Sequence, residues 1–126
     1  MIVVDSCGWI EFLADGPLAD DYVPYFALPD EIITPLVVVY EVIKKIWREQ
    51  GKEKAMLIVA QMQQTRIVPL NQHLAIAAAD ASLHRGLPMA DAIVYATGLE
   101  CGCMIVTGDR HFKGLPGVVF ISEDNS

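Results

Sequence analysis

The sequence lacks the long apolar segments and the leader that would direct a chain to a membrane or out of the cell. No uninterrupted apolar run in its 126 residues reaches the length of a bilayer span. The first residues, Met1 to Asp5, carry no basic region and no cleavage pattern, so no signal peptide is predicted. We therefore expect a cytoplasmic protein with no membrane partner.

Cysteine is also scarce. The chain has three, Cys7, Cys101 and Cys103, and no Cys-x-x-Cys pair. An odd number of thiols is typical of a reducing compartment and excludes a disulfide framework. Two neighbouring thiols, Cys101 and Cys103, are a weak signal for zinc, and we interpret them as small buried apolar residues.

Basic side chains are outnumbered by acidic ones, nine to sixteen, which gives a net charge of −7. This balance argues against a protein that coats nucleic acid by bulk electrostatics. The charges are also unevenly distributed. Five of the nine Lys and Arg residues lie between Lys44 and Lys54, whereas residues 11–41 carry seven acidic side chains and no basic one. Such an acidic region is either a solvated surface or a place that holds divalent cations.

Short apolar segments at 2–4, 31–34, 67–70, 104–107 and 118–121 are typical of strands buried on both faces of a sheet. Helical patterns separate them. Ser6 is predicted to cap the first helix, and Thr34-Pro35 to provide a cap and a first helical residue for the third. Strands that alternate with helices predict an α/β fold, residues 1–126 as one domain, with a mostly parallel sheet in a three-layer α/β/α sandwich.

The helix that follows Pro35 also carries charges of interest. Its apolar residues at helical spacing fall on one side of the helix: Leu36, Val39, Tyr40, Ile43 and Trp47. Its charged residues fall on the other side: Glu41, Lys44, Lys45 and Arg48. These three basic residues are either a solvated face or a binding surface for phosphates of a substrate.

Four carboxylates occupy positions that a parallel sheet would bring to one edge. Asp5 follows the first strand, Asp109 lies two residues after the strand 104–107, and Asp91 falls in the first turn of a helix. Glu41 lies in the first two turns of the helix after the second strand. Ligands of such sheets gather at the carboxyl ends of the strands, where strand order switches, and a helix N-terminus favours an anion.

Each of these acids, taken alone, has a structural interpretation. Asp5 and Asp109 suit turns, Asp91 suits the start of a helix, and Glu41 has lysines three and four residues further on. Together, four carboxylates would repel one another and raise their pKa values unless cations neutralised them. Sites built from oxygen ligands suit Mg²⁺ or Mn²⁺, and such ions act on phosphates. The four acids therefore predict a metal-dependent phosphoryl-transfer site.

Two other enzyme classes also place an Asp after their first strand. Phosphatases of the haloacid-dehalogenase type need a second Asp two residues on, where Cys7 stands. Response-regulator receivers need an acidic pair and a later Lys after a strand, and neither is found. Both classes are disfavoured.

The chain resembles, over essentially its whole length, the PIN-domain ribonucleases, specifically the VapC-type toxins of bacterial and archaeal toxin–antitoxin pairs. The matching pieces are Val-Val-Asp5-Ser6, Glu41 in the helix after Thr34-Pro35, Leu87-Pro-Met-Ala-Asp91-Ala-Ile-Val-Tyr-Ala-Thr, and Ile-Val-Thr107-Gly-Asp109-Arg-His-Phe112. The last two pieces, at their mutual spacing, are the most specific.

The resemblance implies a five-stranded parallel sheet and an acidic site for Mg²⁺ or Mn²⁺, with Asp5, Glu41, Asp91 and Asp109 as the catalytic, metal-binding residues. Thr107, and less surely Ser6, would supply hydroxyls beside that site. The resemblance also implies an RNA substrate, a homodimer and a cognate antitoxin that covers the site. A PIN-like module that only binds RNA or protein, and a PIN nuclease of RNA processing without an antitoxin, are the alternatives.

Two positions depart from the family pattern. Cys7 stands where a small polar residue is common, and His111 stands where many relatives carry an acidic or amide side chain. Neither change removes one of the four acids. The role of His111 in binding metal, substrate or antitoxin is left open.

Overall fold

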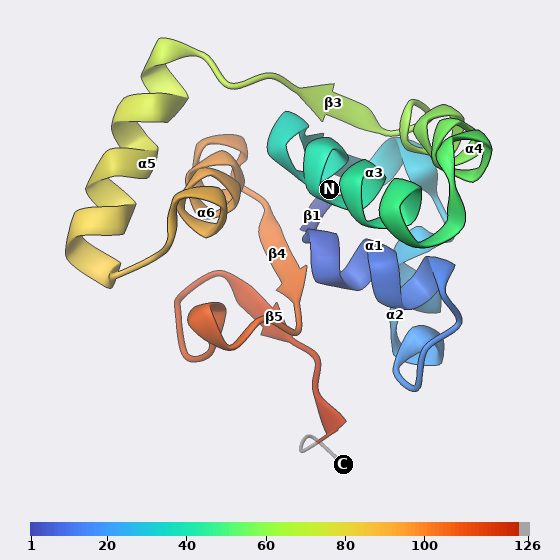
Figure 1. Ribbon diagram of the computed structural model, residues 1–126. Coiled ribbons are helices and arrows are strands. Elements are labelled where there is room, and N and C mark those ends of the chain that lie inside the picture. Colours follow the sequence, from blue (N-terminus) through green and yellow to red (C-terminus); the bar gives the residue numbers. More distant parts are fainter. Residues whose placement is uncertain (124–126) are drawn as a thin grey trace.

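The computed structural model describes residues 1–123 and contains one parallel sheet (Figure 1). Its strands are β1 (Ile2–Val4), β2 (Ile32–Pro35), β3 (Arg66–Val68), β4 (Met104–Thr107) and β5 (Val118–Phe120). They lie in the order β3-β2-β1-β4-β5, and each neighbouring pair is parallel. The α/β fold class and the five-stranded sheet expected from the sequence are therefore confirmed.

Six α-helices cover the two faces of the sheet (Figure 1). They are α1 (Ser6–Leu13), α2 (Ala19–Phe26), α3 (Leu36–Gln50), α4 (Lys52–Met62), α5 (Gln72–Arg85) and α6 (Met89–Cys101). Two short 3₁₀ turns, η1 (Pro29–Glu31) and η2 (Arg110–Phe112), complete the described chain. No helix in this part of the chain has the length and apolar character needed to cross a membrane.

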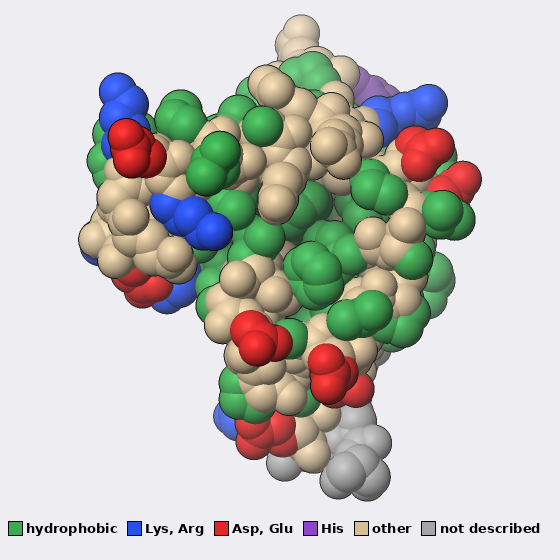
Figure 2. All heavy atoms as spheres, turned by 90° about the vertical axis from the view of Figure 1, so that its right-hand side faces the viewer, with side chains coloured by type: hydrophobic (Ala, Val, Ile, Leu, Met, Phe, Trp, Pro, Cys, Tyr) green, Lys and Arg blue, Asp and Glu red, His purple; other side chains and the backbone are tan. Residues whose placement is uncertain are grey.

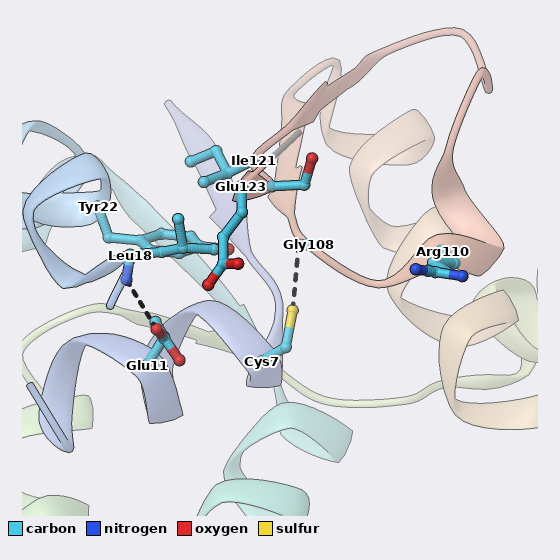
Figure 3. A pocket seen from close by; sticks show the side chains of 9 residues that line it. Cys7, Glu11, Leu18, Tyr22, Gly108, Arg110, Ile121 and Glu123 are labelled. Carbon is cyan, nitrogen blue, oxygen red and sulfur yellow. Dashed lines mark hydrogen bonds between the residues drawn. The ribbon is translucent and has the colours of Figure 1, made fainter. Parts of the chain in front are cut away.

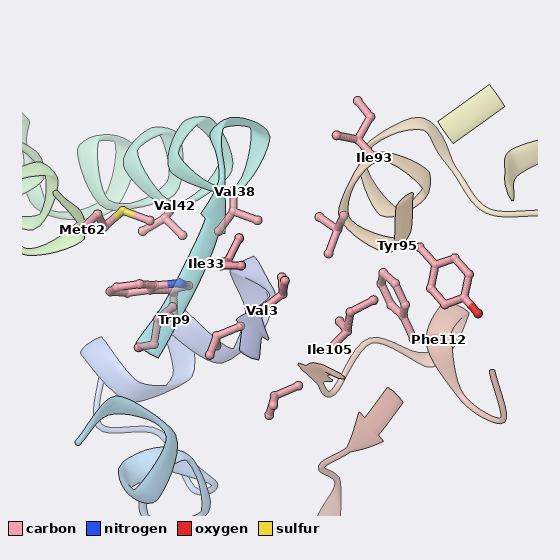
Figure 4. Close-up of a cluster of buried hydrophobic side chains, with 14 of the residues drawn as sticks. Val3, Trp9, Ile33, Val38, Val42, Met62, Ile93, Tyr95, Ile105 and Phe112 are labelled. Carbon is pink, nitrogen blue, oxygen red and sulfur yellow. The ribbon is translucent and has the colours of Figure 1, made fainter. Parts of the chain in front are cut away.

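Apolar side chains from the sheet and the helices form the core (Figure 4). Around Trp9, which is only 3% exposed, lie Val42 and Met62 of α3 and α4. A second part of the core gathers Tyr95 of α6 and Phe112 of η2, whose ring centroids are 6.3 Å apart. Because Phe112 is fully buried, η2 is anchored to the core although its neighbouring residues face solvent.

The starts of two helices differ from the sequence prediction. Asp5, not Ser6, is the N-cap of α1, and its Oδ1 accepts a hydrogen bond of 2.8 Å from the Ser6 backbone N–H. Pro35 ends β2 and precedes α3 instead of forming its first turn. The Thr34 hydroxyl is then unavailable as a cap, because it is buried and lies 2.6 Å from the hydroxyl of Thr65.

The predicted apolar stripe identified α3 as a helix but not its buried face. The side chains of α3 that enter the core are Val38, Val42 and Ile46. Tyr40 is 62% exposed and Trp47 46% exposed. The helix has apolar residues over much of its circumference, so spacing alone does not decide which side faces the sheet.

The contact between α6 and β4 depends on the absence of a side chain at Gly98. A Cβ at this position would lie 2.6 Å from Cγ1 and 2.7 Å from Cδ1 of Ile105. We expect Gly98→Ala to lower the free energy of unfolding by about 1–3 kcal/mol, measured by urea denaturation, because the buried contact would be overpacked. Adding Ile105→Val, which removes Cδ1, should recover part of this loss. Equal stability of Gly98→Ala and the wild type would contradict this packing account.

Candidate metal centre

The pairing of β1 with β4 brings distant parts of the sequence to one edge of the sheet. Val4 lies opposite Val106, and the Asp5 backbone N–H donates to the Val106 carbonyl at 3.0 Å. Asp5 and Thr107 are therefore neighbours at the carboxyl ends of adjacent strands. The chain leaves β1 toward β2 on one side and reaches β4 on the other, so this edge is a switch point in strand order.

Thr107 fixes the Asp5 carboxylate. Its hydroxyl donates to Asp5 Oδ2 at 2.9 Å and accepts a hydrogen bond of 3.0 Å from the Asp109 backbone N–H. Asp5 Oδ1 is held by the Ser6 N–H. Since Asp5 is only 2% exposed, these bonds set the direction in which its carboxylate points.

Cys7 belongs to the same network, a role that the sequence pattern did not reveal. Its Sγ lies 3.7 Å from Asp5 Oδ2, as a donor, and 3.3 Å from the Thr107 hydroxyl. The Gly108 backbone N–H donates to the sulfur at 3.3 Å. Burial, and then the charge of Asp5, raise the pKa of the Cys7 thiol to about 11. The thiol is thus protonated at neutral pH, and its hydrogen bonds connect Asp5, Thr107 and Gly108.

His111 bridges two of the predicted acids. Its Nδ1 lies 2.9 Å from Asp109 Oδ1 and 3.0 Å from Asp91 Oδ2. These three residues each offer one ligand atom within 4.8 Å of the others. Asp109 is the N-cap of η2, and its Oδ1 also accepts the His111 backbone N–H at 2.9 Å. The turn therefore aims the imidazole at both carboxylates.

Glu41 lies on the α3 side of the same edge but outside that close group. Burial raises the pKa of the Glu41 carboxyl, and the charges of Asp5 and Asp109 raise it further. A hydrogen bond with the Ser6 side chain has the opposite effect. The predicted hydroxyl of Ser6 therefore faces Glu41, whereas that of Thr107 faces Asp5.

Burial and neighbouring charges destabilise the ionised forms of Asp91 and Asp5. Burial, followed by the charges of Asp109 and Asp5, raises the pKa of the Asp91 carboxyl to about 7, and His111 opposes this shift. Burial likewise raises the pKa of Asp5, with a smaller contribution from Asp109. Buried carboxylates that lie this close together are unfavourable in their charged forms, so they are neutralised either by protons or by a cation.

The donor set fits a divalent metal. Asp91 and Asp109 offer carboxylate oxygens and His111 an imidazole nitrogen, with Asp5 and Glu41 close enough to raise the pKa of Asp91. Carboxylate oxygens suit Mg²⁺ and Mn²⁺, and imidazole is accepted by transition metals.

The basic residues of α3 do not join this cluster. Lys45 pairs with Glu49 at 3.1 Å, and the Lys44 ammonium lies 5.6 Å from the centre of the Tyr40 ring. Lys44 and Arg48 border an apolar hollow between α3 and α4. Within residues 1–123, none of the three forms an ion pair with the four carboxylates.

Comparison with known families identifies the class of protein. Residues 2–118 match the PIN domain, so the chain belongs to the PIN domain family, as the sequence resemblance indicated. Sequence comparison with curated proteins found no significant match.

Solved structures with the same fold include proteins of toxin–antitoxin pairs. A toxin–antitoxin complex from Klebsiella pneumoniae aligns with a TM-score of 0.80 at 20% identity, covering 94% of this chain and 96% of that one. FitAcB from Neisseria gonorrhoeae gives 0.73 at 19% identity, covering 96% and 97%. VapC20 from Mycobacterium tuberculosis, titled a sarcin–ricin loop cleaving toxin, gives 0.72 at 16% identity, covering 98% and 92%.

The raised pKa of Asp91 predicts how stability depends on pH without metal. An unfolded Asp ionises near 3.8, whereas Asp91 in the folded protein ionises near 7. Between these values the folded state keeps a proton that the unfolded state has lost, so stability falls as pH rises. We expect a lower Tm at pH 8 than at pH 5 in EDTA, and a smaller difference in Asp91→Asn. The matched control is Asp20→Asn on the exposed surface of α2, which should leave the difference unchanged.

Proposed function

We propose that this protein is a metal-dependent endoribonuclease of the VapC type, the toxin of a toxin–antitoxin pair. The observation that carries the proposal is the convergence of Asp5, Glu41, Asp91 and Asp109 at the switch point of the sheet. Burial, with the charge of Asp109 and of neighbouring acids, raises the pKa values of Asp5, Glu41 and Asp91. Membership of the PIN domain family and the toxin–antitoxin structural neighbours support it.

The carboxylates of Asp91 and Asp109, with Asp5 and Glu41 beside them, would hold Mg²⁺ or Mn²⁺. When bound, the ion would lower the pKa of a water and neutralise charge on the phosphate. Thr107 keeps the Asp5 carboxylate oriented, and the Cys7 thiol donates to the same oxygen. No side chain needs to act as the nucleophile. Water attacks the phosphodiester in line, leaving a 5′-phosphate and a 3′-hydroxyl.

We propose single-stranded or looped RNA as the substrate. A protein with a net charge of −7 gains little from coating a duplex, whereas exposed bases and a bent backbone can reach a local site. One structural neighbour is described as a toxin that cleaves the sarcin–ricin loop, which supports an RNA loop as target. A toxin of this kind would act in the cytoplasm.

An antitoxin is the partner that we propose for the apolar hollow between α3 and α4. This hollow, of about 540 Å³, is lined by Val39, Tyr40, Ile43, Trp47 and Val59, with Lys44 and Arg48 at its border. Lys44 and Lys52 lie over the rings of Tyr40 and Trp47. Figure 2 shows further apolar side chains in a hollow on the α4 side of the molecule. An amphipathic helix with acidic residues would match the hollow between α3 and α4, because its apolar face would cover the apolar lining and its acidic residues would pair with Lys44 and Arg48.

We also propose that the toxin itself is a homodimer. Ile76 and Leu83, seven residues apart on α5, are 64% and 83% exposed. Apolar side chains at this spacing share one face of a helix. A second copy is one surface that would cover them, as expected from the family resemblance.

A non-catalytic PIN-like module remains the second candidate, and a cleavage assay separates the two. We expect purified protein freed of antitoxin to cleave RNA with Mg²⁺ or Mn²⁺ and not with EDTA. Asp5→Asn and Asp91→Asn should lower kcat/KM at least about 100-fold, because they alter the proposed ligand set.

Asp80→Asn makes the same chemical change on the exposed face of α5 and serves as the control, with expected wild-type cleavage. Full cleavage by the Asp5 and Asp91 variants would refute the metal-site mechanism. Absence of cleavage by wild type, with RNA binding retained, would favour the non-catalytic module.

The partner proposal is tested with Tyr40→Ala/Trp47→Ala. We expect this variant to bind the product of a short reading frame adjacent to the gene at least about tenfold more weakly, measured by calorimetry, because exposed aromatic residues dominate such interfaces. Leu28→Ala, at an exposed apolar residue outside both proposed surfaces, is the control and should bind normally. If sedimentation instead shows that the Tyr40/Trp47 variant loses self-association, the hollow belongs to the dimer and the antitoxin assignment fails.

A further inference from the structure

Two hollows open side by side next to the acidic edge of the sheet. The first, of about 400 Å³, is lined in part by Cys7, Gly108, Arg110 and Ser122. The second, of about 390 Å³, shares the last three of these residues and adds Lys113 and Phe120. Because Cys7 Sγ lies 3.7 Å from Asp5 Oδ2, the first hollow begins beside the candidate metal centre. Because Gly108, Arg110 and Ser122 line both hollows, the two adjoin, and we describe them together as one path from Cys7 to Lys113.

The two ends of this path carry opposite charge. Figure 3 shows Glu11 and Glu123 on one side of the first hollow and Arg110 on the other, with Cys7 and Gly108 between them. The Glu11 carboxylate accepts the Leu18 backbone N–H at 2.8 Å, which holds it in place. Among residues 1–123, no acidic side chain lines the second hollow. A polyanion that enters this path is therefore directed toward the second hollow.

The cations of the second hollow are available to a ligand. Arg110 and Lys113 are exposed, and within residues 1–123 neither forms an ion pair with an acidic side chain. The Lys113 ammonium lies 5.8 Å from the centre of the Phe120 ring, so charge and an aromatic surface adjoin. Buried Phe112, between Arg110 and Lys113 in the sequence, anchors this turn in the core.

A nuclease with four carboxylates at its centre must overcome their repulsion of RNA. A metal ion offsets part of this charge at the scissile phosphate, but the neighbouring phosphates need cations of their own. Guanidinium and ammonium groups bind phosphate oxygens directly, and an aromatic side chain offers a surface for a base. The second hollow has these three components in its lining, and Arg110 lies between Asp109 and His111 of the candidate metal centre in the sequence.

We propose that the hollow lined by Gly108, Arg110, Lys113, Phe120 and Ser122 is an RNA subsite that binds the nucleotide next to the scissile bond. Arg110 and Lys113 hold its phosphate, and Phe120 forms the apolar wall against its base. This inference rests on the proposed nuclease function. It assigns the phosphate contacts to the η2 turn rather than to Lys44, Lys45 and Arg48 of α3.

The test compares two double variants that each remove two positive charges. Binding is measured by fluorescence anisotropy with labelled single-stranded RNA of randomised sequence, in the Asp5→Asn background with Mg²⁺, so that the RNA stays intact. We expect Arg110→Ala/Lys113→Ala to raise Kd about tenfold and to reduce the slope of log K against log salt by about 0.7, the value for one phosphate contact on a single strand. Lys44→Ala/Lys45→Ala should change Kd less than about twofold.

The conservative variant Arg110→Lys/Lys113→Arg should retain most of the affinity, which separates charge from folding defects. Equal weakening by the two alanine double variants would mean bulk electrostatics only and would overturn the subsite. Unchanged binding by Arg110→Ala/Lys113→Ala would also overturn it.

Cleavage by the protein with an intact site is measured separately. If it cleaves RNA and Arg110→Ala/Lys113→Ala raises KM with little change in kcat, both proposals stand. If it cleaves no RNA but the binding difference persists, the nuclease proposal fails and the RNA subsite stands. If cleavage occurs with an unchanged KM in the variant, the subsite alone fails.

Discussion

The parallel pairing of β1 with β4 is the constraint on which the site depends. Only three to four residues of each strand take part, yet the register places Asp5 beside Thr107 across an interval of about a hundred residues. Every other contact at this edge follows from that alignment. Thr107 reaches Asp5 on one side and receives the Asp109 N–H on the other, and Cys7 closes the network through Gly108. Asp5 is thus positioned by backbone pairing, and its hydrogen bonds with Ser6 and Thr107 leave its carboxylate little freedom.

This fixed arrangement explains why the electrostatics of the site are unfavourable without a cation. In a flexible loop, Asp91 and Asp109 would separate and ionise independently. Here α6 and η2 are both packed on the core, so burial, together with repulsion from the charges of Asp109 and Asp5, raises the pKa of Asp91. The imidazole of His111, which contacts both carboxylates, relieves part of this repulsion. Carboxylates that are held in place in this way are neutralised by a proton or by a cation.

The sequence was sufficient for the fold class and the strand and helix order, because short apolar strands and helical spacing are local signals. It also placed the four acids at one edge, since parallel topology alone brings strand ends together. Contacts that depend on how distant strands and loops align in space could not be predicted from the sequence. Cys7 is an ordinary thiol in the sequence, and its role depends on the loop at Gly108. The buried face of α3 was likewise undetermined, because apolar residues occur around most of that helix. The prediction that Ser6 caps α1 was wrong, because Asp5 is the N-cap and its carboxylate accepts the Ser6 backbone N–H. The sequence alone does not decide which of these two adjacent polar residues is the cap.

The short turn η2 carries side chains of three different kinds within four residues. Asp109 and His111 face the candidate metal centre, Arg110 borders the adjoining hollows, and Phe112 is fully buried. The length of this turn is therefore constrained from three directions at once. An insertion or deletion would move the acid, the imidazole and the guanidinium together, or expel the phenyl ring from the core. Divergence within such a family can proceed here by exchange of side chains, while the number of residues between Asp109 and Phe112 stays the same.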